Sequence, residues 1–206
     1  MYGLRPVKHK QRYLSPCRLG VVIVSTSQTE FYKGFSFLNH SWNMKFLEKD
    51  LEEIIFKASP KDLQERGLYL PKKRFRQLKI GNYGVADIVY FSCFPERTPN
   101  GTNGHYARIG VYELKQETIS LSAFLQAIRY IKGIKRYIQE RGCFDNLLWL
   151  TYHIVLIGKK IDINSDLVYL PDVLEGYHDS GVCFELDLFT YDFDLKSGLS
   201  FKQHKY

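Results

Sequence analysis

Three charged residues stand in otherwise apolar segments of the sequence and are the first candidates for chemistry. Asp87 interrupts residues 84–90, a run whose other members favour a β-strand, an element in which Asp is depleted. Glu113 and Lys115 belong to a second such run, residues 111–115, and share one face of a strand. Two charges on one face of an apolar strand are unfavourable unless they are paired or used. A Glu–Lys ion pair at an exposed strand edge is the alternative interpretation.

A hairpin between these two strands would bring Asp87 and Glu113 together. Two adjacent carboxylates raise each other's pKa unless a cation binds between them. Oxygen ligands of this kind suit Mg²⁺ or Mn²⁺. Lys115, beside them, could orient or deprotonate a metal-bound water. The three residues therefore indicate metal-assisted hydrolysis.

The elements that must position these residues follow from hydrophobic periodicity and turn residues. Strands are predicted at residues 19–25, 74–80, 85–93, 108–115, 147–157 and 182–193. Helices are predicted at residues 42–58, with Ser41 as the N-cap, and from Ser120 or Ser122 to about Glu140, closed by Gly142. Residues 94–107 and 171–180 are predicted loops. This order predicts a mixed α/β domain around one central sheet.

The second predicted helix has three stripes along its surface at helical spacing. The core stripe consists of Phe124, Ala127, Ile128, Ile131 and Ile138. A basic stripe consists of Arg129, Lys132 and Arg136, and a polar and aromatic stripe of Gln126, Tyr130, Gly133 and Tyr137 lies between solvent and core. Gln126 and Tyr130 are neighbours on the helix surface. By itself this pattern is also that of an ordinary amphipathic helix.

Asp87, the Glu113-x-Lys115 pair and the Gln126-x-x-x-Tyr130 helix together resemble the PD-(D/E)XK nuclease superfamily. Within it, the Gln-x-x-x-Tyr helix is similar to that of RecB-type exonucleases and archaeal mismatch-specific endonucleases. Residues 48–54 are similar to the Glu-bearing first helix of that group. The resemblance covers about residues 44 to 140, with weaker support at 150–157. Ala86 stands where the family's name has Pro, a position at which many members also lack it.

The resemblance implies a restriction-endonuclease-like fold, a mixed central sheet flanked by helices with an αβββαβ core. A single domain is expected, with the nuclease-like part at residues 41–206 and residues 1–40 as an N-terminal extension that adds one strand. The implied metal ligands are Asp87, Glu113 and the backbone carbonyl of Leu114, with Glu48 acting directly or through water. Glu52 and Glu53 lie close enough in sequence to compete with Glu48. Lys115 would position the attacking water, and Gln126 and Tyr130 would orient the scissile phosphate or Lys115.

The charge of the chain favours a polyanionic partner. Lys and Arg total 29 against 22 Asp and Glu, a net charge of +7. The residues that could hold a phosphate backbone without reading sequence are Lys72, Lys73, Arg74 and Arg76, before the Asp87 strand, and Arg129, Lys132 and Arg136 on the second helix. For any single one of these residues, an ordinary solvated surface position is an equally good interpretation.

Other classes of protein are disfavoured by the sequence. It has no apolar run of about 18 residues, so no membrane span is expected, and no secretory signal, so a cytoplasmic location is expected. Its four Cys lie far apart without a C-x-x-C pair, which argues against a zinc site. The six His share no ligand spacing, and Asp187, Asp192 and Asp194 are interpreted as an acidic patch or hairpin edge.

We therefore expect a Mg²⁺- or Mn²⁺-dependent nuclease that hydrolyses DNA phosphodiester bonds, with a homodimer as a common assembly for nucleases of this fold. A Holliday-junction-type resolvase is one alternative. A nucleic-acid-binding module that keeps the fold without hydrolysis is another, although the intact Asp87, Glu113 and Lys115 argue against it. A third is an interaction protein in which the pattern is coincidental.

Overall fold

The computed structural model describes residues 47–98, 100–101, 103–142, 147–174, 178–179, 182–194 and 196–205. The predicted extension at residues 1–40, with its strand at 19–25, and the proposed N-cap Ser41 lie outside these residues. The described elements are α1 (Glu48–Lys57), α2 (Pro60–Glu65), β1 (Arg74–Lys79), η1 (Gly81–Tyr83), β2 (Val85–Arg97), β3 (Asn103–Leu114), β4 (Thr118–Ile119), α3 (Leu121–Arg141), β5 (Leu147–Gly158), β6 (Lys160–Ile161), η2 (Asp166–Tyr169), α4 (Leu170–Leu174), β7 (His178–Asp179), β8 (Val182–Asp194) and β9 (Gly198–His204).

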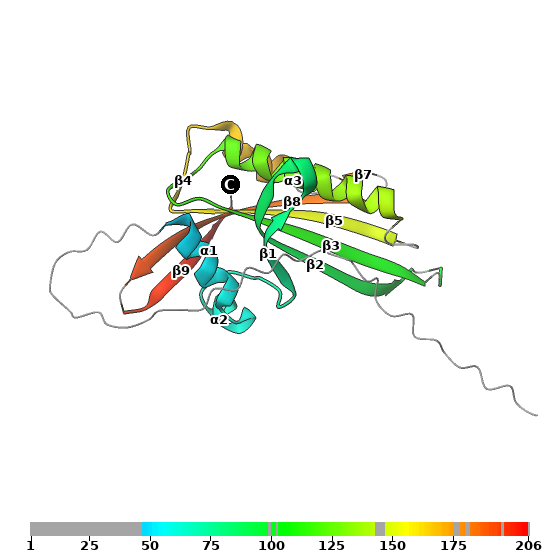
Figure 1. The fold of residues 1–206 in the computed structure, drawn as a ribbon, viewed down its shortest axis with the longest axis horizontal. Coiled ribbons are helices and arrows are strands. Elements are labelled where there is room, and N and C mark those ends of the chain that lie inside the picture. The colour runs from blue at the N-terminus through cyan, green and yellow to red at the C-terminus, as the bar shows by residue number, and fades with distance from the viewer. Residues whose placement is uncertain are drawn as a thin grey trace, which may run out of the picture. The chain divides into compact units, whose positions relative to one another are not determined.

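A mixed sheet of seven strands forms the centre of the described part, in the order β1-β2-β3-β5-β8-β7, with β9 also paired to β8. β1, β2 and β3 are antiparallel neighbours, whereas β3, β5 and β8 run parallel. The helix α3 connects the parallel strands β3 and β5 and lies across one face of the sheet (Figure 1). The predicted α/β class with a mixed central sheet and flanking helices is therefore confirmed.

Hydrophobic cores cover both faces of the sheet. On one face, α3 packs on even-numbered β5 residues such as Tyr152, Ile154 and Leu156. On the other face, α1, α2 and β9 pack on the odd-numbered β5 residues Val155 and Ile157. Burial on both sides explains why this strand is a continuous apolar run in the sequence.

Glycine permits α3 to pack closely on the β1–β2 connection. A Cβ at Gly133 would lie only 2.5 Å from Ile80 and 2.6 Å from Tyr83, so no other residue fits without displacing them. Gly133 is therefore buried and does not lie on the intermediate stripe predicted for it. The predicted end of this helix is confirmed, because Gly142 has the left-handed conformation, with φ 58°, that closes a helix.

The predicted loop at residues 94–107 is wrong. β2 continues to Arg97, β3 begins at Asn103, and these extensions pair with each other. Pro95 is tolerated because the described β1–β2 pairs end at Tyr90, so this part of β2 has a partner on one side only. Phe94 stacks on Tyr106 across the pair, with ring centroids 6.4 Å apart, and stabilises the extended hairpin.

Three further boundaries differ from the sequence predictions. The first helix has Leu47 at its N-cap, where Ser41 was expected, because Asp50 accepts from the Leu47 backbone N–H and stabilises that first turn. The predicted loop at 171–180 contains the end of α4 and the short strand β7. The strand β9, which pairs with β8, lies beyond residue 193, where the last predicted strand ends. None of the described helices has the length and apolar character that a membrane crossing requires.

Candidate active site

Asp87 lies at a point where the sheet opens on both sides of β2. In the β1–β2 ladder, Arg76 pairs with Ile88 and Leu78 with Ala86, and the intervening Gln77–Asp87 pair is not formed. The described β2–β3 pairs also stop beside Asp87, with Ile88 opposite Tyr112. Asp87 has no pair in either of these described ladders. Its side-chain Oδ2 accepts a hydrogen bond of 2.8 Å from the Leu114 backbone N–H. The two strands thus place Asp87 next to Glu113, as the predicted hairpin requires.

Glu113 is buried, with an exposed fraction of only 1%. Its Oε1 accepts a hydrogen bond of 2.6 Å from Lys115 Nζ, which confirms that the two side chains share a face. Its Oε2 is buried and has no hydrogen-bond partner among the residues that the structure describes. A carboxylate oxygen left in this state is unfavourable unless a ligand completes its coordination.

The electrostatics of these acids follow from burial and mutual repulsion. Burial, together with the nearby Asp87 charge, raises the pKa of Glu113 to about 7 in spite of the Lys115 ammonium. Burial likewise raises the pKa of Asp87 to about 6, and Glu48 adds to the rise. Burial alone would lower the pKa of Lys115, but the Glu113 and Glu48 carboxylates raise it, so the ammonium remains charged. When ionised, the carboxylates of this site therefore carry more negative charge than the Lys115 ammonium can neutralise.

Glu48, not Glu52, is the acid of α1 that faces this site. Glu48 Oε1 lies 4.0 Å from Lys115 Nζ. Glu52, one turn later, is nearly fully buried and accepts hydrogen bonds from the side chains of Arg76 and Gln77. Each of its two oxygens accepts one of these hydrogen bonds, so Glu52 is engaged in joining α1 to β1.

The residues present suit a divalent cation that prefers oxygen ligands. Asp87 and Glu113 supply carboxylates whose pKa values are raised by burial and by repulsion from neighbouring carboxylates, and Glu113 Oε2 has no partner within the described part of the chain; a bound cation would favour the ionised form of both acids. Among the described residues no group of three or more His, Cys, Asp or Glu side chains converges as a metal centre. The proposed set differs from such a group, because its third member is the backbone carbonyl of Leu114 and Glu48 acts at longer range.

Gln126 and Tyr130 form a hydrogen-bonded pair on α3. Gln126 Nε2 donates to Tyr130 Oη at 2.6 Å, and Tyr130 is almost fully buried. The ring of Tyr130 packs on Gly84, where a Cβ would lie 2.9 Å from it, and the Arg129 guanidinium lies 5.7 Å from its centroid. The described contacts of this pair do not include Asp87 or Lys115, so its role toward a phosphate stays a prediction.

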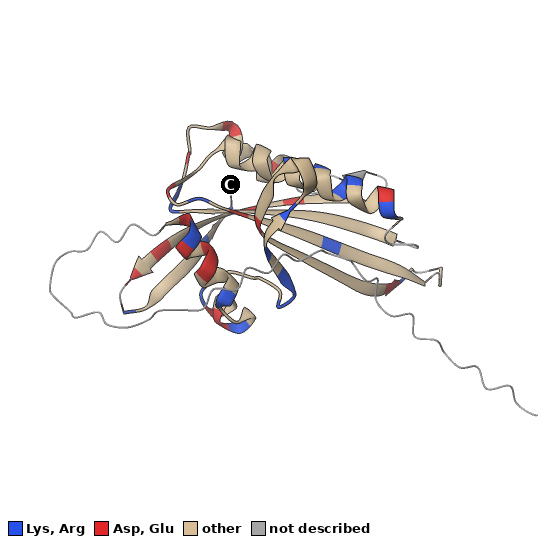
Figure 2. Cartoon of the chain, in the orientation of Figure 1, with Lys and Arg blue, Asp and Glu red and all other residues tan. Residues whose placement is uncertain are grey.

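The basic residues separate into two kinds. Arg74 donates to the Phe56 and Ala58 carbonyl oxygens at the end of α1, at 2.5 Å each, and Arg76 pairs with Glu52. These two guanidinium groups anchor α1 to β1, so their predicted role at a phosphate backbone competes with a structural one. The exposed members of the predicted set are Lys72, Lys73, Arg129, Lys132 and Arg136, the last of which pairs with Glu140 at 2.6 Å. Figure 2 shows basic residues along α3.

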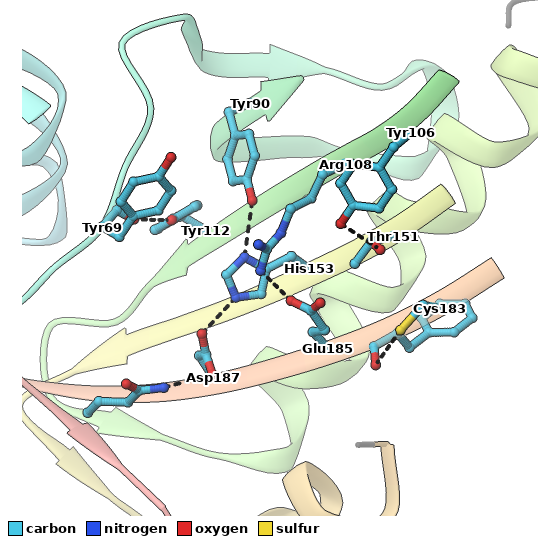
Figure 3. Close-up of polar contacts among 12 residues, drawn as sticks. Tyr69, Tyr90, Tyr106, Arg108, Tyr112, Thr151, His153, Cys183, Glu185 and Asp187 are labelled. Carbon is cyan, nitrogen blue, oxygen red and sulfur yellow. Dashed lines mark hydrogen bonds and ion pairs between the residues drawn. The ribbon is translucent and has the colours of Figure 1, made fainter. Parts of the chain in front are cut away.

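A second polar cluster lies away from this site and was missed in the sequence. We call it the His153–Asp187 network: Tyr90, Arg108, His153, Glu185 and Asp187, with Gln203 (Figure 3). His153 contacts Tyr90 Oη through Nδ1 at 3.2 Å and Asp187 Oδ2 through Nε2 at 2.8 Å. Gln203 donates to Asp187 Oδ1 at 2.9 Å, and Arg108 pairs with Glu185.

Gly110 makes this network possible. It lies opposite His153 in the β3–β5 register, and the ring of Tyr90 crosses β3 directly over it. A Cβ at Gly110 would lie 1.8 Å from that ring. The available signal in the sequence was the alternation of polar residues at Thr151 and His153, which a run of apolar neighbours concealed.

Comparison of the chain with protein-family models, with curated proteins and with solved structures gives no significant match.

Proposed function

We propose that this protein is a metal-dependent nuclease that hydrolyses DNA phosphodiester bonds. The observation that carries the proposal is the half-buried Asp87 beside the buried Glu113, which is joined to Lys115 and whose Oε2 has no hydrogen-bond partner among the described residues. The order helix, three strands, helix, strand, formed by α1, β1–β3, α3 and β5, supports a restriction-endonuclease-like core.

Asp87, Glu113 and the Leu114 carbonyl would hold Mg²⁺ or Mn²⁺, with Glu48 at longer range. When bound, such an ion neutralises phosphate charge and lowers the pKa of a coordinated water. Lys115 stays protonated beside Glu113, where its ammonium can orient the attacking water and offset negative charge on the phosphate oxygens. The exposed basic residues of α3 would contact the nucleic-acid backbone, which makes binding depend steeply on salt.

The proposal is tested by incubating the protein with linear, circular, single-stranded and branched DNA, and with RNA, in Mg²⁺, in Mn²⁺ and in a chelator. We expect cleavage with either metal, none in the chelator, and none with Asp87→Asn or Glu113→Gln. Asp187→Asn is the control, because it removes a half-buried, hydrogen-bonded carboxylate outside the site.

Three outcomes would redirect the proposal. Cleavage restricted to branched DNA would assign a resolvase, and cleavage restricted to RNA would change the substrate. Binding of DNA without any cleavage by the wild-type protein would assign the nucleic-acid-binding module. Cleavage that persists in the chelator, or in both site variants, would contradict the proposed chemistry.

A further inference from the structure

Gln77 has an unusual backbone conformation in the middle of β1. Its φ is 49°, and among the described residues it is the only one other than glycine with a positive φ. Side chains with a Cβ are disfavoured there, and Gln is not among the residues that visit this region readily. Conformations of this kind persist where the surrounding structure enforces them, and they concentrate at functional sites.

The position of Gln77 in the sheet is as important as its conformation. In the β1–β2 register it stands opposite Asp87, and this one pair is missing although the pairs on either side of it are formed. No residue is inserted, because the register is the same before and after the gap. The backbone turn at Gln77 therefore coincides with the point at which Asp87 leaves the ladder and its carboxylate reaches the Leu114 N–H.

The side chain of Gln77 connects the same point to α1. Its Nε2 donates to Glu52 Oε2 at 2.5 Å, and Arg76 holds the other oxygen of that carboxylate. Glu52 lies one helical turn after Glu48, on the same side of α1. Fixing Glu52 therefore fixes the direction of Glu48, whose carboxylate lies 4.0 Å from Lys115 Nζ.

We propose that Gln77 is a positioning residue for the metal-dependent site, an inference that rests on the proposed nuclease function. Its left-handed backbone opens the ladder so that Asp87 is free to act as a ligand. Its amide holds α1 so that Glu48 faces Lys115. The two effects belong to different atoms of one residue, and substitutions separate them.

Gln77→Gly and Gln77→Val both delete the amide but differ in backbone preference. Glycine adopts a positive φ without strain, whereas the β-branched valine favours a regular strand. We expect Gln77→Gly to keep the wild-type Mn²⁺ affinity and to lose turnover, through Glu48. We expect Gln77→Val to lose Mn²⁺ affinity as well, by about 10- to 100-fold, as is typical when a group that orients a ligand is removed.

The experiment is Mn²⁺ titration by calorimetry at a pH above the pKa values of Asp87 and Glu113, beside single-turnover DNA cleavage. Thermal unfolding checks that each variant folds, and Gln77→Ala takes the place of Gln77→Val if the latter does not. Equal Mn²⁺ affinity in the Gly variant and the Val or Ala variant would overturn the inference. Full turnover in Gln77→Gly would overturn the role of the amide.

Asp87→Asn separates this inference from the proposed function. If wild type binds Mn²⁺ and Asp87→Asn does not, the metal site stands whatever the Gln77 variants do. If wild type fails to bind Mn²⁺, or if Asp87→Asn binds it unchanged, both the proposed function and the role of Gln77 are contradicted.

Discussion

Glu113 and Asp187 are carboxylates on strands of the same sheet, separated by β5, and they differ in burial and in the hydrogen-bond donors that reach them. Asp187 has a donor for each oxygen, Gln203 on one and His153 on the other. Burial alone would raise its pKa, yet these hydrogen bonds hold the pKa below its ordinary value. Within the described part of the chain Glu113 has one donor and one oxygen without a partner, and burial together with the Asp87 charge raises its pKa to about 7.

This difference distinguishes an acid whose two oxygens both receive hydrogen bonds from protein side chains from an acid with one oxygen that receives none from the described residues. The donors of Asp187 come from the protein itself, so its network needs no ligand. At Glu113 the charge deficit is shared with Asp87, and a cation is the partner that would remove it. The hydrogen-bond donors that reach a carboxylate therefore distinguish a structural acid from a candidate ligand.

The largest expected effect is on cleavage. Glu113→Gln should lower the single-turnover rate by on the order of 10³-fold, because it removes charge that the metal and the transition state require. Asp187→Asn should leave that rate within a few-fold of wild type, measured at a temperature where both variants are folded. Equal losses in the two variants would remove the functional distinction between the clusters.

Lys115→Ala should lower turnover by about 10²–10³-fold while it leaves Mn²⁺ affinity unchanged or increased. The reason is that the proposed ligands Asp87 and Glu113 remain, while the ammonium proposed to orient the water is lost. Lys115→Arg should be nearly as inactive, because its planar guanidinium places the charge differently. Loss of Mn²⁺ affinity in parallel with turnover would instead make Lys115 a structural partner of Glu113.

The pH dependence of stability should have opposite signs for the two acids. The pKa of Glu113 rises from 4.5 to about 7 on folding, so the metal-free protein loses stability as the pH rises through that interval, by on the order of 3 kcal/mol. Asp187 has a lowered pKa, so its contribution is present above pH 3.8 and is lost on acidification. Denaturant unfolding in a chelator should show that Glu113→Gln reduces the loss of stability as the pH rises. Asp187→Asn should reduce the loss of stability on acidification. A Glu113→Gln slope identical to wild type would contradict the raised pKa.

The smallest expected effect concerns the hydroxyl of Tyr90. Tyr90→Phe should lower the free energy of unfolding by about 1 kcal/mol, because it removes a buried hydrogen bond to His153, and should leave cleavage unchanged. Tyr106→Phe is the matched control, since its hydroxyl bonds Thr151 in a less buried place. Loss of cleavage in Tyr90→Phe would show that the network does more than stabilise the sheet.

The parts of this molecule that local patterns define could be predicted from the sequence. Asp87, Glu113 and Lys115 stood out because charge is rare in apolar strands, and Gly142 marked the end of α3. The hairpin beyond Phe94 was missed because Pro and Gly favour loops locally, whereas cross-strand pairing decides the outcome.

Features that depend on distant partners could not be predicted. His153 and Asp187 are 34 residues apart and meet only through the β5–β8 register. Arg74 and Arg76 were expected at a phosphate backbone, but their anchoring of α1 depends on where that helix lies. The backbone of Gln77 is likewise set by its surroundings, since no local residue preference favours a positive φ there.

The passage of the Tyr90 ring over Gly110 has an evolutionary consequence. With 1.8 Å between that ring and a hypothetical Cβ, the Gly110 position cannot gain a side chain while Tyr90 keeps its ring in this place. Related chains that carry another residue at the Gly110 position should therefore have a smaller side chain at the Tyr90 position.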